Sequence, residues 1–146
     1  MPTPNAPPEQ AIARFRADLL KCGCNDDQTY GICVSGGADS LALLLLAKAA
    51  SLKIKVVTVD HRLRPASATE AQHVAAICAQ LGVAHENIVL GNPHRGNLSD
   101  WARTARYAAL RHWAEREHID LLVTAHHGPI SAALCLAGAR LNLLRW

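Results

Sequence analysis

The sequence predicts an α/β fold, a doubly wound parallel sheet of about four strands with helices packed against it. Short β-branched runs alternate four times with longer apolar segments of helical periodicity. Half of the residues are hydrophobic but only 4% are aromatic, so alanine and leucine supply most of the apolar side chains, which suits helices packed on a sheet. With 146 residues, the chain fits one domain that can bury its own core.

The first half of the chain contains two expected strands and two expected helices. Four prolines among the first eight residues disfavour regular structure there, and the amphipathic residues 9–20 predict a helix that covers the sheet. Strands are expected at residues 30–34 and 53–59. Between them, residues 40–52 are almost entirely apolar, which predicts a helix buried against the sheet.

The second half repeats this alternation. A helix at residues 69–81 and a strand at 83–90 are expected to precede a long helix at 99–118. A fourth strand at 120–124 and a final apolar helix at 130–144 complete the prediction, with right-handed crossovers between the strands. The long helix is expected to turn four of its residues toward the interior, namely Trp101, Ala105, Ala108 and Trp113.

A glycine loop between the first strand and the next helix is the first candidate site. It consists of Ser35-Gly36-Gly37-Ala38-Asp39-Ser40. Glycines let backbone N–H groups approach a bulky anion, and the positive end of the following helix faces the same point, so a phosphate site is expected. The spacing is neither G-x-x-x-x-G-K-[ST] nor G-x-G-x-x-G. Because a carboxylate repels polyphosphate, Asp39 suggests a bridging Mg²⁺. The alternative is an ordinary capped turn before a helix.

This loop resembles the SGG-x-DS loop of the N-type ATP pyrophosphatases, which split ATP into AMP and pyrophosphate while they adenylate a substrate. The resemblance implies a Rossmann-like fold of the adenine-nucleotide alpha-hydrolase kind. It also implies that all six loop residues hold the pyrophosphate of ATP, with Asp39 as a ligand of Mg²⁺.

A second segment, residues 59–71, is similar to the VDHGLRP-x-S-x-x-EA segment of the tRNA(Ile)-lysidine synthetases, which belong to the same group. It places Asp60 and His61 at the carboxyl end of a strand, where open α/β sheets bind ligands, and on the adenosine side of the cleft. The alternative is that these side chains only cap and solvate a loop.

Three residues of this segment carry expectations about the backbone. Arg62 stands where the family usually has glycine, and such a glycine implies an unusual backbone angle, so the arginine should be strained or the loop should shift. Ser67 is expected to cap the following helix, with Glu70 in the capping-box position.

A third segment, residues 96–107, resembles the GN-L-x-x-x-AR-x-x-RY segment of the same family. Arg103 and Arg106 are three residues apart and are expected on one helix face, with Tyr107 beside Arg103. Such a pair suits a phosphate or the edge of a nucleotide, and a solvated basic face is an equal alternative. The resemblance implies that both arginines contact the cytidine or the developing charge.

The last match is Thr124-Ala125-His126-His127, where the family has TAHH followed by x-D-D-Q-A-E-T. The resemblance makes His126 and His127 residues of the catalytic cleft, but the two aspartates are replaced by Pro129 and Ile130. Residues 128–146 match nothing in the family. We therefore expect an ATP pyrophosphatase domain at 1–127 and a divergent or truncated tail at 128–146, without the family's C-terminal tRNA-binding regions.

Together these matches imply a tRNA(Ile)-lysidine synthetase. Such an enzyme uses ATP to adenylate the C2 carbonyl of the wobble cytidine of tRNA(Ile), and lysine then displaces AMP. One alternative is another N-type ATP pyrophosphatase, such as a tRNA thiolase or an amidotransferase synthetase domain. The chain lacks the Cys-x-x-Cys pairs that thiolases carry. The other is a non-catalytic nucleotide-binding remnant, which the replaced aspartates favour.

Composition sets further bounds. The net charge is only +3, but residues 95–111 contain four arginines and one acid, which favours a nucleic-acid partner at this segment.

Five scattered cysteines without a Cys-x-x-Cys pair indicate free thiols in a reducing compartment, and Cys22-x-Cys24 lacks a matching half of a metal site. The apolar runs are too short to span a membrane, so a cytoplasmic protein without a membrane partner is expected.

Overall fold

The computed structural model describes residues 6–62, 65–91, 98–125, 133–136 and 139–145. These residues form four helices and six strands. The helices are α1 (Glu9–Lys21), α2 (Ala38–Ala49), α3 (Ser67–Leu81) and α4 (Leu98–Arg116). The strands are β1 (Thr29–Cys33), β2 (Lys53–Asp60), β3 (His85–Val89), β4 (Leu121–Thr124), β5 (Ala133–Leu136) and β6 (Ala139–Arg145).

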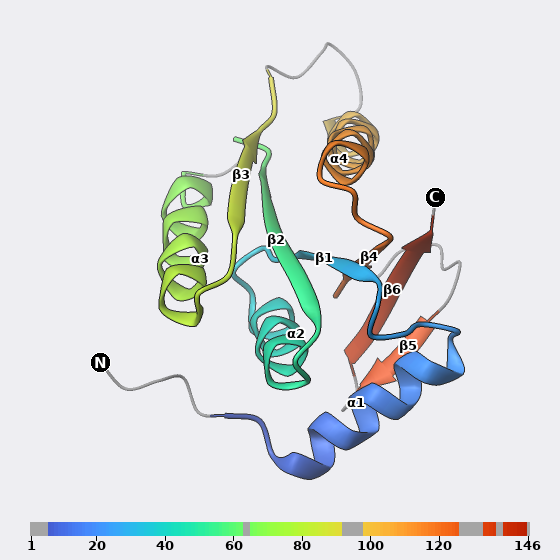
Figure 1. Ribbon diagram of the computed structural model, residues 1–146. Coiled ribbons are helices and arrows are strands. Elements are labelled where there is room, and N and C mark those ends of the chain that lie inside the picture. Colours follow the sequence, from blue (N-terminus) through green and yellow to red (C-terminus); the bar gives the residue numbers. More distant parts are fainter. Residues whose placement is uncertain (1–5, 63–64, 92–97, 126–132, 137–138, 146) are drawn as a thin grey trace.

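All six strands belong to one sheet in the order β3-β2-β1-β4-β6-β5 (Figure 1). The four strands from β1 to β4 run parallel, as the sequence predicts. The chain first builds outward from β1 through β2 to β3, and then crosses back to place β4 on the other side of β1. This reversal of strand order next to β1 is where open α/β sheets form a ligand crevice.

The expected final helix at residues 130–144 is wrong, because the described part of this segment forms the strands β5 and β6. β6 pairs antiparallel with β4, and β5 pairs antiparallel with β6. β4 would otherwise leave a row of backbone N–H and C=O groups unpaired at the edge of the sheet, and the ladder with β6 satisfies them. A short run rich in leucine and alanine does not reveal this, since its periodicity fits a strand as well as a helix.

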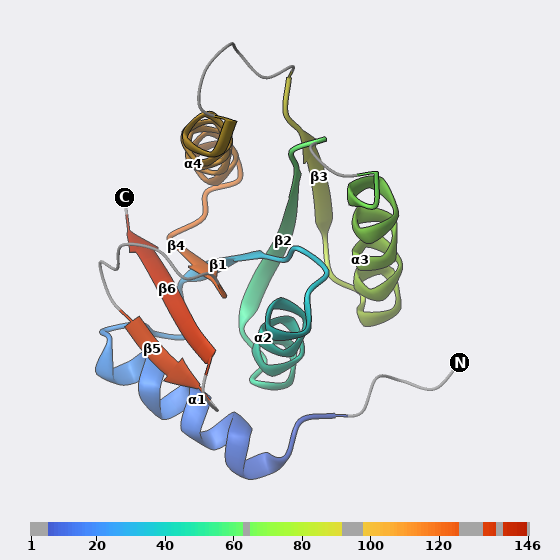
Figure 2. The same cartoon turned by 180° about the vertical axis from the view of Figure 1, so that it is seen from behind.

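Helices cover both faces of the sheet, as a doubly wound fold requires. On one face, α1, α2 and α3 pack over the sheet through side chains such as Phe15, Leu44 and Val74. On the other face, α4 packs through Leu110 and Trp113. Figures 1 and 2 show α4 on one side of β1 and α2 on the other. None of the described helices is long and apolar enough to cross a membrane.

The position of α4 is fixed by one close contact with β1. A Cβ atom at Gly31 would lie 2.7 Å from Cζ3 of Trp113 and 2.9 Å from Cγ2 of Ile119, so only glycine lets the indole lie this close to the strand. Trp113 is buried as expected, whereas Ala108 is exposed. The buried stripe of α4 instead consists of Ala102, Leu110, Trp113 and Ala114.

Candidate active site

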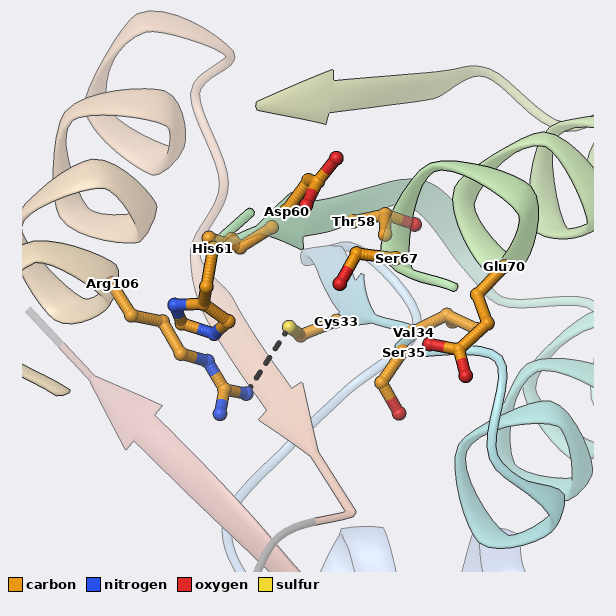
Figure 3. A pocket seen from close by; sticks show the side chains of 10 residues that line it. Cys33, Val34, Ser35, Thr58, Asp60, His61, Ser67, Glu70 and Arg106 are labelled. Atoms are coloured by element: carbon orange, nitrogen blue, oxygen red, sulfur yellow. Dashed lines mark hydrogen bonds between the residues drawn. The ribbon is translucent and has the colours of Figure 1, made fainter. Parts of the chain in front are cut away.

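A cavity of about 480 Å³ opens at the carboxyl ends of β1 and β2 (Figure 3). This volume falls in the range of about 300–1,000 Å³ that is usual for small-molecule sites. The register aligns Cys33, the last residue of β1, with Val57 of β2 and Thr124 of β4, so the loops that follow these strands leave from one edge of the sheet. The cavity is lined by Cys33, Val34, Ser35, Thr58, Val59, Asp60, His61, Ser67, Glu70 and Arg106.

The glycine loop lies beside this cavity and leads into α2. Ser40 holds the loop together, because its Oγ donates to the Gly37 carbonyl at 3.0 Å and accepts from the Ser35 N–H at 3.2 Å. The N-cap residue of α2 is Gly37, and no side chain caps this end of the helix. The first N–H groups of α2 therefore remain available at the positive end of the helix dipole. This arrangement suits an anion.

The two glycines of the loop serve different purposes. Gly36 has φ of +92°, and a Cβ there would approach Cβ of Glu70 to 3.3 Å, so the backbone itself requires glycine. Gly37 has an ordinary φ of −70°, and a Cβ there would meet only Ser35 Oγ at 3.6 Å. The fold does not require glycine at position 37. Its missing side chain instead leaves open space at the helix end, which a phosphate group can occupy.

Asp39 lies in the first turn of α2 and is exposed. Within the described residues, no three His, Cys, Asp or Glu side chains gather into a group that could hold a metal ion. Mg²⁺ usually binds through one or two carboxylates together with substrate phosphates and water. Asp39, in the first turn of a helix whose end has no side-chain cap, fits that mode of binding and does not fit a cage made by the protein alone.

The loop after β2 contains the strained arginine that the sequence predicts. Arg62 has φ of +54°, and its backbone N–H donates to Oδ1 of Asp60 at 2.8 Å. Arg62 thus adopts a backbone angle that favours glycine although it has a side chain, and this strain costs about 1–3 kcal/mol. Asp60 is only 6% exposed, and both Asp60 and His61 line the cavity.

The capping box expected at the start of α3 is not formed. The N-cap residue is Ala66 and no side chain caps the helix, so Ser67 lies one position inside it. The reason is that Ala66 already has the helical angles φ −74° and ψ −14°, which moves the helix start ahead of Ser67. Ser67 and Glu70 line the cavity instead (Figure 3).

The two arginines of α4 do not share one environment. Arg106 lies four residues after Ala102 and four residues before Leu110, so it is on the same face of the helix as the buried stripe. From this face it reaches into the cavity. Its Nη2 donates to Sγ of Cys33 at 3.5 Å. Arg103 is exposed and lies 6.0 Å from the ring centre of Tyr107, a cation–π distance. Of the pair, only Arg106 lies in the cavity.

Sequence reasoning missed Cys33 and Thr58 as residues of the cavity, and treated Ser67 and Glu70 as caps. An i, i+3 or i, i+4 pattern could have placed Arg106 on the buried stripe of α4, but no local signal connects it with Cys33, which is 73 residues away. His126 and His127 lie outside the described residues.

The parallel sheet, the glycine loop and the cavity at the carboxyl ends of β1 and β2 define a nucleotide-binding α/β domain. A family model described as the PP-loop domain matches residues 7–130, and the chain therefore belongs to the PP-loop domain family. The sequence resemblance to this group is confirmed.

Curated relatives give a more specific comparison. The tRNA(Ile)-lysidine synthase of Zymomonas mobilis is 44% identical over 110 residues, which cover 75% of this chain and 33% of that protein. The tRNA(Ile)-lysidine synthase of Novosphingobium aromaticivorans is 43% identical over 120 residues, which cover 80% of this chain and 36% of that protein. The chain thus spans about a third of the length of these relatives.

Solved structures support the fold. The U34-tRNA thiolase NcsA from Methanococcus maripaludis superposes with a TM-score of 0.67 at 16% identity, over 82% of this chain and 45% of that one. The NH3-dependent NAD synthetase from Campylobacter jejuni superposes with a TM-score of 0.54 at 15% identity, over 78% and 52% of the two chains. At these identities the likeness shows a shared fold and nothing more specific.

Proposed function

We propose that this chain is the ATP-binding domain of a ligase of the tRNA(Ile)-lysidine synthetase type. In that reaction the C2 carbonyl oxygen of the wobble cytidine attacks the α-phosphate of ATP and pyrophosphate leaves. The amine of lysine then attacks C2, and AMP leaves. The relatives that share 38–46% identity with the chain carry this enzyme's name, which supports the proposal. The proposal includes an ATP pyrophosphatase domain that extends over residues 1–127 and a cytoplasmic location.

The observation that carries the proposal is the open helix end at Gly37 beside the cavity. The uncapped N–H groups of α2 bind the phosphates, and the loop from Ser35 to Ser40 surrounds them. The adenosine lies toward the ends of β1 and β2, between the glycine loop and the Asp60-His61 pair. Several lining residues, among them Val34, Thr58 and Asp60, are buried, and electrostatic contacts with the nucleotide are stronger at such a partly desolvated surface than in water.

Each remaining candidate residue has a proposed task. Asp39 would hold Mg²⁺ together with the phosphates, and the ion would supply positive charge that neutralises them. Arg106 stabilises charge in the cavity, and Arg103 contacts the tRNA at the surface of α4. His126 and His127 follow β4 in the sequence and are proposed as catalytic residues on the strength of the family motif alone.

Binding of ATP can be tested at Gly37 without disturbing the fold. The replacement Gly37→Val places a side chain in the open space at the helix end, and its Cβ meets only Ser35 Oγ at 3.6 Å. We expect affinity for ATP with Mg²⁺, measured by calorimetry, to fall about tenfold or more. Gly91→Val is the matched control, because a Cβ at Gly91 meets nothing within 4 Å and this residue does not line the cavity. Equal affinity in the Gly37→Val and wild-type chains would contradict the proposal.

A second candidate function is nucleotide binding without catalysis. It is favoured by one observation in the sequence, the Pro129 and Ile130 that replace two family aspartates. Neither side chain can accept a proton or bind a metal ion. ATP–pyrophosphate exchange in the presence of tRNA(Ile) separates the two functions. Only the ligase forms an adenylated intermediate, from which added pyrophosphate regenerates ATP.

A further inference from the structure

The cavity contains a contact that no motif predicts, between the guanidinium of Arg106 and the thiol of Cys33. Nη2 donates to Sγ at 3.5 Å, as the dashed line in Figure 3 shows. Among the described lining residues Arg106 is the only lysine or arginine, alongside the carboxylates of Asp60 and Glu70. The direction of this one guanidinium therefore decides where the cavity presents permanent positive charge.

Cys33 is well suited to fix that direction. It ends β1, it is 3% exposed, and its two neighbours in the sheet, Val57 and Thr124, are both buried. Its sulfur thus belongs to a buried strand that is paired on both sides, whereas an arginine side chain has many rotamers and loses conformational entropy when it is held. Trp113 on Gly31 fixes α4 against the same strand, so both ends of the contact are anchored to β1.

The chemistry of the thiol also suits this task. A carboxylate at this position would hold the guanidinium more strongly, but it would cancel the positive charge. Sulfur is a weak acceptor, so it takes one N–H of the guanidinium and leaves the charge and the other donors to a ligand. An anion with several oxygens, such as a polyphosphate, can use them.

We propose that Cys33 is a positioning residue, which holds the guanidinium of Arg106 toward the phosphates of the bound nucleotide. The inference rests on the proposed function, because it takes ATP as the anion in the cavity. Cys33 itself does not touch the reacting atoms. It acts through Arg106, and its effect therefore disappears when Arg106 is absent.

The test compares ATP with adenosine, which has no phosphates, on Cys33 variants of the full chain. We expect Cys33→Ala to weaken ATP binding about three- to tenfold, as for the loss of one ordinary hydrogen bond, and to weaken adenosine binding by a clearly smaller factor. Cys33→Ser keeps an acceptor and should recover most of the ATP affinity. Cys78→Ala is the matched control, because Cys78 is equally buried but does not line the cavity. In an Arg106→Gln background, Cys33→Ala should have no further effect.

The outcomes separate this inference from the proposed function. If the wild-type chain binds ATP and Cys33→Ala binds it equally well, the proposed function stands and Cys33 is not a positioning residue. Equal losses for ATP and adenosine, or an added loss in the Arg106→Gln background, also overturn the inference, since Cys33 would then only shape the cavity. If the wild-type chain binds no ATP, the proposed function is wrong, and the inference falls with it.

Discussion

Asp60 and Arg62 close a tight turn at the end of β2, in which a buried carboxylate accepts the backbone N–H of a residue with left-handed angles. The distance is 2.8 Å and φ of Arg62 is +54°. The hydrogen bond keeps the turn in a conformation that favours glycine, and in doing so it holds Asp60 at the wall of the cavity.

Relief of this strain should stabilise the protein. Arg62→Gly removes a left-handed cost of about 1–3 kcal/mol, against about 0.5–1 kcal/mol of added chain entropy in the unfolded state. We expect the free energy of unfolding in urea to rise by about 0.5–1 kcal/mol. Arg62→Ala is the control, because it removes the same side chain and keeps the strain. A gain of the same size for alanine would show that the side chain, and not the angle, is responsible.

The contact between Gly31 and Trp113 gives a prediction of the opposite sign. Gly31→Ala would place a methyl group 2.7 Å from the indole, so α4 must shift or the strand must bend. We expect the free energy of unfolding to fall by about 1–3 kcal/mol. Gly37→Ala is the control, since its Cβ makes only an ordinary contact. An unchanged stability of Gly31→Ala would mean that α4 moves away from β1 at no cost.

The stability of the protein should depend on the protonation of His85. Burial lowers the pKa of its imidazole below the ordinary 6.5, against a smaller opposing effect of the Glu86 carboxylate. Its Nε2 shares a 2.9 Å hydrogen bond with Oγ1 of Thr58, which lines the cavity. The unfolded chain therefore binds more protons than the folded one as the pH falls below 6.5, and the folded state loses stability down to the lowered pKa.

Urea unfolding at about pH 7.5 and about pH 5.5 measures this loss. His85→Gln cannot titrate, so it should show a smaller difference between the two conditions than the wild-type chain. His112→Gln, a replacement of an exposed histidine on α4, should keep the wild-type difference. If His85→Gln keeps it too, the acid sensitivity comes from other groups.

The proposed contact between α4 and tRNA should be electrostatic. Arg103 is exposed beside Tyr107, and its removal should lower the slope of log affinity against log salt by about one unit. Arg14→Ala, on the exposed side of α1, is a charge-matched control that should change neither affinity nor slope. If Arg103→Ala behaves as the control does, this part of α4 is a solvated surface.

This chain should bind ATP but should not catalyse the formation of lysidine at a measurable rate. Because Pro129 and Ile130 replace two aspartates of the family motif, and a general acid or base commonly contributes about 10²–10⁴-fold in rate, we expect ATP binding without measurable lysidine. Replacing the segment from Gly128 with Ala-Asp-Asp-Gln, together with a family-like downstream domain, should restore part of the activity. Lysidine formed in tRNA(Ile) by the unmodified chain with ATP and lysine would disprove this prediction.

The sequence predicts the fold through local signals, and the structure confirms most of them. The alternation of strands and helices is right as far as β4, and the expected strand at residues 83–90 differs from β3 (His85–Val89) only at its ends. The Asp60-His61 pair lies where the motif suggests, because the end of a parallel strand faces the crevice.

The failures concern partners that lie far apart in the chain. β6 is a strand because β4 offers an open edge, a condition that cannot be recognised within residues 139–145 themselves. Cys33 joins the site only because α4 crosses β1 and brings Arg106 to it. The error at Ser67 is of a different, local kind, because α3 begins one residue earlier than its capping pattern indicates.

The way α4 lies along β1 has a consequence for how the protein can change over evolutionary time. Trp113, near the end of the helix, is locked onto Gly31, while Arg106, closer to its start, faces the ligand crevice. Substitutions at Trp113 must preserve a close-packed contact, whereas substitutions at Arg106 are limited mainly by what the crevice binds. Two positions on one helix are thus under different selection, one for packing and one for binding, so specificity can change at Arg106 while the contact with Gly31 is kept.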